Sequence, residues 1–489
     1  YLTSYKIRSL HVFWHNDTTI IIRDENPERK GMGAKQRIYT AGFLYYTVLK
    51  VRTDFRKGRQ EDVMERNDPR YQAYVEILKE ELIPAMGCTE PIALAYAAAK
   101  AREVLGVLPD SVQLQVSGSI IKNVKSVIVP NTGHLKGMEA AVAAGIIAGS
   151  AEKELEVISE VSEEKKSAIR DYLQTVPITI EHTEQGHVFD IVVTERCGQD
   201  YARVRIADYH TNICRIEKNG TVLYEVPLLD ETVQEDARAD RSLLNMQDIW
   251  DFAETADLRD VADLLERQIR YNNAIAEEGL LGDYGANIGR VLLTTYGNDV
   301  SNRAKAKAAA GSDARMNGCE LPVIINSGSG NQGITCSVPL IEYAKELHSG
   351  KEKLYRALII SNLVAIHEKT GIGTLSAYCG AVSAGAGAGA GIVYLCGDGY
   401  QAAIHTVVNA LAIVSGIVCD GAKASCAAKI ASSVDAALLG YNMYKCNQEF
   451  KGGDGIVMKD IETTIKGIGR LGKDGMRQTN EEIIRLMMS

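Results

Sequence analysis

The second half of this sequence is dominated by small residues, and these limit the folds that the chain can adopt. From Asn245 almost to the C-terminus the pattern is helical, rich in Ala and Gly, and interrupted by clusters of Gly. Small residues let helices approach closely and bring backbone near a buried site. Even the uncharged run 376–396 is mostly Ala and Gly, which is too weakly hydrophobic for a membrane span. The pattern therefore predicts closely packed helices and no membrane partner.

The residues that precede this helical half mix two periodicities. Helical patterns fall at 71–82, 91–105, 138–148 and 152–166. Strand-like patterns fall at 112–116, 127–130, 178–180, 188–194 and 202–206, and a hairpin is expected within 212–226 with its turn at Asn219-Gly220. We therefore expect an α+β fold. A mainly helical domain would be formed by both chain ends, residues 64–110 and 235–489, with an α/β domain inserted at 111–234.

The first 63 residues differ in composition from the rest of the chain. They carry 12 Lys and Arg against 7 Asp and Glu, whereas the whole chain has a net charge of −9. The sequence begins on Tyr, and an ordinary start would be Met64. One interpretation is a small basic accessory segment that binds something. The favoured one is upstream sequence that does not belong to the working protein, so we assign the segment no function.

Charge and cysteine content narrow the class of protein further. With a net charge of −9, no global basic field attracts nucleic acid or an anionic membrane. Ten cysteines in 489 residues are far too few for a secreted disulfide scaffold, and no signal peptide is visible. We therefore expect a cytoplasmic protein with reduced thiols and no nucleic-acid partner. A homo-oligomer is left open.

Three cysteines sit among small residues in the helical half. Cys379 precedes a Gly/Ala stretch, and Cys419 and Cys426 follow within the run 416–426. Thiolates are the usual ligands of iron–sulfur clusters, and small neighbours leave room for a bulky inorganic group. Spacing alone is a weak signal, because Cys-x6-Cys is neither a ferredoxin run nor a zinc knuckle and buried free Cys is common. From spacing alone, three inert core cysteines are favoured.

A fourth cysteine, Cys88, lies in the run Gly87-Cys88-Thr89-Glu90-Pro91 just before a predicted helix. The positive end of the helix dipole would lower the pKa of a thiol there. A thiolate at this turn could act as a nucleophile, a ligand or a base. Simple packing of the cysteine in a turn, with Glu90 as a first-turn charge, fits the spacing equally well.

Other polar residues suggest an anion site. The loop that carries Ser327, Ser329 and Asn331 follows an apolar run and presents backbone N–H groups and hydroxyls, which suit a carboxylate or phosphate. It lacks the Gly-Lys-Ser/Thr of a Walker A loop. Arg315 offers a charge for the same anion, although a surface ion pair is a common fate of such a residue. Lys122, Asn123 and His210 fall at the ends of predicted strands, where sites collect but where most polar residues are structural.

Taken together, these segments resemble the L-cysteine desulfidase family, a relative of the iron–sulfur L-serine dehydratase alpha chain. The likeness runs from about residue 65 to the C-terminus and rests on ordered matches at 84–91, 210–213, 312–316, 326–335, 375–379 and 416–426. The resemblance implies that the helical domain is catalytic, that Cys379, Cys419 and Cys426 ligate a [4Fe-4S] cluster, and that Cys88 accepts a proton. It implies no role for Cys319 or Cys336.

The implied reaction is a carbon–sulfur lyase reaction without pyridoxal phosphate. L-Cysteine and water would give pyruvate, ammonia and hydrogen sulfide, with one iron left open to the substrate. The substrate would be a small amino acid bound by Ser327, Ser329, Asn331, Arg315, Lys122, Asn123 and His210. Three alternatives stay open: an iron–sulfur L-serine dehydratase, a non-catalytic metal or redox-sensing protein, and a zinc-stabilised structural protein.

Overall fold

The chain divides into two compact units, Tyr1–Val63 and Met64–Ser489. The computed structural model describes residues 4–7, 10–15, 19–24, 37–40, 64–183, 187–226, 228, 238–373 and 375–488. In the first unit, four antiparallel strands pair in sequence order: β1 (Ser4–Ile7), β2 (Leu10–His15), β3 (Thr19–Asp24) and β4 (Arg37–Thr40). Whether residues 1–63 are an accessory segment or upstream sequence stays a prediction, because most of these residues lie outside the described ranges.

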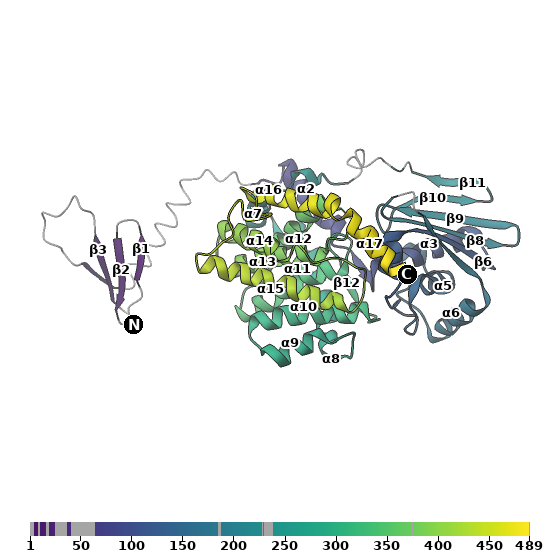
Figure 1. Cartoon of the computed structure of the whole chain (residues 1–489), viewed down its shortest axis with the longest axis horizontal. Helices are drawn as coiled ribbons and strands as arrows, with labels where there is room; N and C mark the ends of the chain where they lie inside the picture. Colours follow the sequence, from purple (N-terminus) through teal and green to yellow (C-terminus); the bar gives the residue numbers. More distant parts are fainter. Residues whose placement is uncertain are drawn as a thin grey trace. The chain divides into compact units, whose positions relative to one another are not determined.

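The second unit contains a six-stranded sheet in the order β11-β10-β9-β8-β6-β7 (Figure 1). Its strands are β6 (Ser111–Ser117), β7 (Ile178–Thr183), β8 (Asp190–Cys197), β9 (Asp200–Ala207), β10 (Ile213–Lys218) and β11 (Thr221–Glu225). Only the β6–β7 pair is parallel among these neighbours. The strands expected at 112–116, 178–180, 188–194 and 202–206 are confirmed, as is the hairpin that turns at Asn219-Gly220.

Four helices accompany this sheet: α3 (Thr89–Leu105), α4 (Gly118–Val124), α5 (Gly137–Ala148) and α6 (Glu163–Thr175). Helix α3 packs on β8 and β9, and α5 packs on α3 and on α6. The helices expected at 91–105 and 138–148 are therefore confirmed. Cys88 is the N-cap of α3, and Gly106 is its C-cap, with a φ of 86° in the left-handed conformation that favours glycine.

Two expectations for this region are wrong. The segment 127–130 forms no strand and makes only an isolated bridge between Ile128 and Lys136, because the chain leaves β6 directly into α4 at Gly118. The single helix expected at 152–166 is also absent. A short 3₁₀ helix, η3 (Ala151–Glu156), ends well before α6, whose start is fixed where the Ser162 side chain accepts from the Lys165 N–H.

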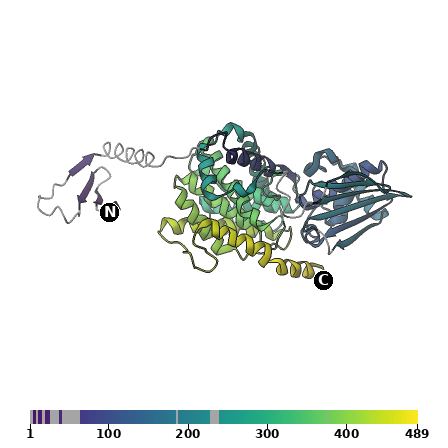
Figure 2. The same cartoon turned by 90° about the horizontal axis from the view of Figure 1, so that it is seen from above.

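The remaining helices form a compact bundle beside the sheet (Figure 2). They are α2 (Pro69–Glu81), α7 (Met246–Thr255), α8 (Ala262–Leu281), α9 (Ile288–Tyr296), α10 (Val300–Met316), α11 (Gly330–Glu346), α12 (Lys351–Ile372), α13 (Gly380–Cys396), α14 (Tyr400–Val414), α15 (Ser425–Lys445), α16 (Ile461–Arg470) and α17 (Arg477–Met488). Shorter elements join them: β5 (Pro84–Met86) paired with β12 (Pro322–Ile324), η5 (Arg241–Leu243), η6 (Leu258–Asp260) and the π-helical turn η7 (Leu471–Gly475).

Helix α13 shows why the small residues matter. Every residue from 381 to 393 is buried. A Cβ added at Gly387 would lie 2.4 Å from the Ser361 carbonyl oxygen of α12, and one at Gly385 would lie 2.8 Å from Ser433 of α15. The expected close packing is therefore confirmed.

No helix in the described part of the chain has both the length and the apolar content needed to cross a membrane.

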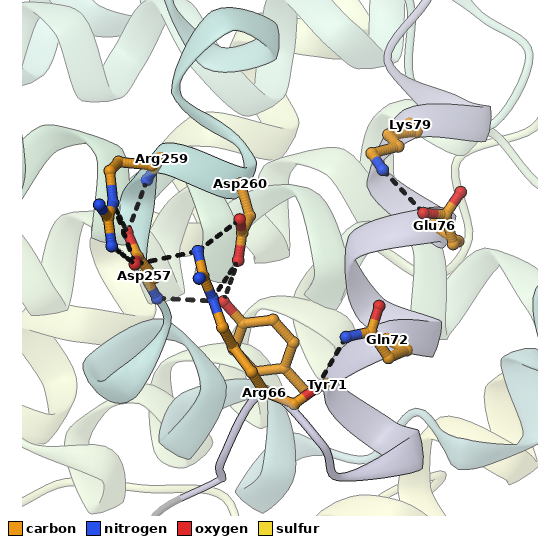
Figure 3. A network of polar contacts seen from close by, with 8 residues as sticks. All are labelled: Arg66, Tyr71, Gln72, Glu76, Lys79, Asp257, Arg259 and Asp260. Carbon is orange, nitrogen blue, oxygen red and sulfur yellow. Dashed lines mark hydrogen bonds and ion pairs between the residues drawn. The ribbon is translucent and has the colours of Figure 1, made fainter.

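The start of the second unit is tied to later helices by a polar network (Figure 3). The Arg66 guanidinium contacts Asp260 of η6 at 2.7 Å, and the Tyr71 hydroxyl donates to the same carboxylate at 2.5 Å. Helix α2 thus joins elements almost 190 residues away in sequence. The α+β class, with a helical part built from both chain ends, is confirmed. The boundaries at 110 and 235 stay a proposal, since α3 packs on the sheet.

A glycine-to-alanine exchange tests the close approach of α3 and α5. A Cβ at Gly145 would lie 2.1 Å from the Ala95 carbonyl oxygen, so Gly145→Ala is expected to cost about 3 kcal/mol of unfolding free energy. The control is Gly467→Ala at an exposed position of helix α16, where the nearest atom lies 3.7 Å away and a gain of about 0.5–1 kcal/mol is expected. Urea unfolding measures both, and equal midpoints would contradict the packing argument.

Candidate active site

A cavity of about 110 Å³ lies where the sheet-associated helices meet the bundle. Ten of the eleven residues predicted to form a site line it: Cys88, Asn123, His210, Arg315, Ser327, Ser329, Asn331, Cys379, Cys419 and Cys426. They come from the starts of α3, α11, α13 and α15, from α4 and the last turn of α10, and from the loops around them. Segments more than 300 residues apart thus meet at one small cavity.

Backbone pairing sets the positions of two of the three cysteines. Tyr378 and Val418 form an antiparallel bridge, and the Cys379 N–H donates to the Ile417 carbonyl at 3.1 Å. In return the Cys419 N–H donates to the Ala377 carbonyl at 2.6 Å. Cys426 follows in the first turn of α15. Cys379 and Cys419 therefore lie on neighbouring extended segments at the N-terminal ends of α13 and α15.

The three thiols are buried or half-buried, and a thiol shielded from water becomes a thiolate only where positive charge lies close to it. Burial, together with the nearby Cys419 and Cys426, raises the pKa of Cys379 to about 12, so its thiolate needs a positive partner. Lys369 lines the cavity and donates to the Gly373 carbonyl, and Lys429 donates to the Val418 carbonyl at 2.8 Å. A metal deprotonates a coordinating thiol outright, so the three cysteines fit a thiolate-ligated iron–sulfur group.

A single metal ion fits less well. Across the described ranges, no group of three or more His, Cys, Asp or Glu side chains converges as the ligands of one ion do. A lone ion such as zinc needs its thiolates at about 2.3 Å from a common centre. The cysteines of an iron–sulfur cluster bind different irons, so they need not converge on one point.

Lys122 is the predicted site residue that does not line the cavity. It is 1% exposed, and its ammonium donates to the Asn480 side chain at 2.6 Å and to the carbonyls of Ser376 and Cys419 at 3.2 and 3.3 Å. These contacts join α4, helix α17 and both cysteine-bearing segments. Lys122 thus binds the backbone carbonyls of both cysteine-bearing segments. The sequence had suggested contact with the substrate instead.

Glu90 forms the centre of a second group around Cys88. The Cys88 thiol donates to Glu90 Oε2 at 3.0 Å, and Asn123 Nδ2 donates to Oε1 at 3.1 Å. His210 Nε2 lies 3.8 Å from Oε1. Burial opposes ionisation of Glu90, but His210 and the Cys88 thiol outweigh it and lower the Glu90 pKa to about 2. The sequence had suggested only a first-turn charge here.

The expected depression of the Cys88 pKa is wrong in direction. Cys88 does begin α3, but burial and then the charge of Glu90 raise its pKa well above the ordinary value. Arg315 acts in the opposite direction and is outweighed. A helix dipole stabilises a charge at its end by about 0.3–1 kcal/mol, whereas moving a thiolate from water into a buried site costs more free energy than that. Cys88 therefore rests as a thiol that donates to a carboxylate.

Five buried polar atoms at this cavity have no hydrogen-bond partner within the described part of the chain. They are His210 Nε2, Arg315 Nε, Arg315 Nη2, Asn331 Oδ1 and Gln332 Oε1. An unpaired buried polar group costs about 1–3 kcal/mol, and a charged one costs more. Arg315 is only 2% exposed, so its guanidinium is a buried cation with two nitrogen atoms that can still bind an anion.

Gln332 was missed from the sequence although it follows Asn331. The Gly330 start of α11 puts both in its first turn, and Gln332 Nε2 donates weakly to the Ser327 carbonyl at 3.5 Å. Its side chain lies against Gly380, where an added Cβ would approach to 2.6 Å. This close contact brings a free amide oxygen next to Cys379.

The Ser327–Gly328 turn is held from the opposite side. Both residues have positive φ, 48° and 75°, and the Thr89 hydroxyl donates to the Gly328 carbonyl at 2.9 Å. Ser329 precedes α11 without capping it, so its hydroxyl is not engaged by the helix end. The turn thus connects the Cys88 segment to the start of α11 at the cavity.

The α+β fold and this buried, cysteine-lined cavity define a lyase-type enzyme once the relatives are considered. The chain belongs to the serine dehydratase alpha chain family, whose pattern it matches over residues 152–485. This confirms the serine dehydratase alpha-like part of the expected resemblance. The narrower L-cysteine desulfidase assignment stays a prediction.

The chain covers nearly the whole length of several similar proteins. A UPF0597 protein of Desulfitobacterium hafniense (strain Y51) is 61% identical over 426 residues, which are 87% of this chain and 99% of the relative. A UPF0597 protein of Lachnoclostridium phytofermentans is 52% identical over 419 residues, 86% of this chain and 100% of the relative. One from Treponema denticola is 46% identical over 430 residues, 87% of this chain and 100% of the relative.

Proposed function

We propose that this chain is an L-cysteine desulfidase, a carbon–sulfur lyase that works without pyridoxal phosphate. It would convert L-cysteine and water into pyruvate, ammonia and hydrogen sulfide. One observation carries the proposal: a small cavity combines three cysteines with buried polar atoms that lack partners among the described residues. All ten cysteines are free thiols, which suits the reducing cytoplasm in which we place the enzyme.

The unpaired atoms fit the two charged groups of an amino acid. A guanidinium matches a carboxylate bidentately, so Arg315 would bind the substrate carboxylate. Asn331 Oδ1 and Gln332 Oε1 are acceptors, and they would take the substrate ammonium. Ser327 and Ser329 also line the cavity, and the Ser327 hydroxyl donates to Asn326 Oδ1 at 2.9 Å. The zwitterion would leave its side chain directed to the cysteines.

Cys379, Cys419 and Cys426 would hold a [4Fe-4S] cluster. When bound, such a cluster supplies an iron with an open position, a Lewis acid for the leaving sulfur. Lys122 holds the carbonyls of both cysteine segments, and Lys369 and Lys429 place positive charge nearby. These cations would offset the negative charge of three thiolates.

The chain's own residues would then prepare the Cα proton for removal. Arg315 neutralises the carboxylate, which makes the adjacent Cα–H more acidic. Cys88 is the proton acceptor that the resemblance implies, and Asn123 holds the Glu90 carboxylate beside it, with His210 Nε2 3.8 Å away. Elimination gives aminoacrylate, which hydrolyses to pyruvate and ammonia with little help from the protein.

The family match is equally compatible with a second candidate, an iron–sulfur L-serine dehydratase, in which hydroxide is the leaving group. Protein reconstituted without oxygen should release sulfide and pyruvate in equal amounts from L-cysteine. We expect kcat/KM to exceed that for L-serine by about 10-fold or more. A higher kcat/KM for L-serine would make the chain a serine dehydratase. An intact cluster with no turnover of either amino acid would indicate a non-catalytic role.

A further inference from the structure

The geometry around Cys88 gives its proton a defined destination. Its thiol donates to Glu90 Oε2 at 3.0 Å, and both residues are buried, with Cys88 3% and Glu90 8% exposed. The other carboxylate oxygen accepts from Asn123 at 3.1 Å. The carboxylate is therefore held at both oxygens, and Oε2 accepts from the thiol together with the Thr89 hydroxyl, which lies at 3.2 Å. Among the described residues that line the cavity, Glu90 carries the only carboxylate.

Two cationic side chains and a histidine ring, from three separate elements, face this carboxylate. Arg315 lies on α10, His210 follows β9, and Lys122 lies on α4. Each favours a negatively charged Glu90, and that charge, added to burial, raises the pKa of Cys88. A thiol in this state cannot take a proton from Cα until it has lost its own. The proton must therefore leave Cys88 in the same step, and Glu90 is the acceptor in contact with it.

We propose that Glu90 is the proton-accepting partner of Cys88: as the sulfur takes the substrate's Cα proton, the original thiol proton passes to Glu90 Oε2. This inference rests on the proposed lyase function. The Cα–H bond breaks and a new S–H bond forms on Cys88, while its old S–H bond breaks and an O–H bond forms on Glu90. The Cα–H electron pair becomes the Cα=Cβ bond, and the Cβ–S pair departs with the leaving sulfur.

The relay changes no net charge, because the negative charge of Glu90 is transferred to the departing sulfide. Cys88 begins and ends as a thiol, which removes the need for a free thiolate in a buried site. Asn123 and the Thr89 hydroxyl keep the carboxyl group in place while it is protonated. When the product leaves, Glu90 loses its proton to water and the carboxylate is restored.

The isosteric exchange Glu90→Gln separates this relay from a lone Cys88 base. In reconstituted full-length protein kept free of oxygen, we expect kcat with L-cysteine to fall by about 100-fold or more. In the same protein, Cys88 should react with iodoacetamide at a pH about one unit lower than in the wild type, because a negative neighbour is gone. Peptide mass spectrometry measures this reaction at Cys88 alone. Misfolding would also expose this buried thiol and increase its alkylation, so circular dichroism must show that the Glu90→Gln protein keeps the wild-type fold.

Two further variants complete the test. Glu90→Asp keeps a carboxylate and should restore part of kcat together with the wild-type pH dependence of alkylation. Glu103→Gln removes an exposed carboxylate from the same helix and should change neither measurement.

A Glu90→Gln enzyme that keeps kcat within about twofold would overturn the relay, because Cys88 would then suffice as a base. Loss of kcat without the acid shift in alkylation would also overturn it, since the carboxylate would then not contact the thiol. If the wild-type protein turns over no amino acid, the proposed function fails and the relay fails with it. Failure of the relay alone leaves wild-type turnover intact, so the two failures are distinguishable.

Discussion

Cys419→Ala is expected to lose its iron and inorganic sulfide and to release no measurable sulfide from L-cysteine. The exchange removes one of three thiolates, while the backbone hydrogen bonds that position this segment involve no side-chain atom of residue 419. Loss of even an outer-shell partner costs a metal site about 10–100-fold, so loss of a ligand should reduce activity by more than about 100-fold. Iron and sulfide analysis, with a sulfide assay, measures both effects on protein purified without oxygen.

The matched control is Cys446→Ala, at an exposed cysteine just after α15. It should keep full iron content and full activity, because it removes a thiol outside the cavity-lining set. Circular dichroism would show that both variants retain the helical fold. A Cys419→Ala protein with wild-type iron content and activity would exclude Cys419 as a ligand, and with it the proposed cluster arrangement.

Arg315→Met is expected to lower activity and to raise stability at the same time. Arg315 has no hydrogen-bond partner for Nε or Nη2 within the described part of the chain, and it is 2% exposed. Truncation of a buried charge partner costs about 2–5 kcal/mol, so kcat/KM should fall by about 30- to 4,000-fold. Without substrate, a buried guanidinium whose Nε and Nη2 make no hydrogen bond destabilises the folded state, even with the Glu90 carboxylate nearby. Methionine of similar length should therefore increase the unfolding free energy by about 1–4 kcal/mol.

Arg303→Met on the same helix is the control for this effect. Arg303 contacts Glu346 at 2.5 Å and Glu342 at 3.6 Å, so its charge is already compensated. Its loss should lower stability and leave kcat/KM unchanged. Urea unfolding of the substrate-free proteins, together with steady-state kinetics, measures both quantities. If Arg315→Met destabilises the protein as Arg303→Met does, the guanidinium is already satisfied and the carboxylate site is wrong.

The two results together would also separate the parts of the proposed site. Cys419→Ala tests the cofactor, because iron content is measured without any substrate. Arg315→Met tests recognition of the amino acid, because it should leave iron content at the wild-type level. A variant that loses both would indicate that Arg315 supports the cysteine segments as well.

Much of the fold could be predicted from local pattern. The strands at 178–180 and 202–206 and the turn at Asn219-Gly220 follow from alternation and turn chemistry, which act over a few residues. The strand predicted at 127–130 is absent, because apolar β-branched residues also occur in buried segments without regular structure. Val127 and Val129 are fully buried without belonging to a strand, and periodicity cannot tell these cases apart.

By itself, the sequence determined the closely packed helical half, the motif segments and most of the residues that meet at the cavity. Its small residues and turn signals act locally, so they can be recognised before the chain folds. Only the tertiary structure decided what each polar side chain contacts. In the folded chain Lys122 binds backbone carbonyls of the cysteine segments, Gln332 packs against Gly380, and the Cys88 thiol donates to Glu90. Burial and neighbouring charge decide a pKa, and both depend on segments hundreds of residues apart, so local pattern could not predict the resting thiol at Cys88.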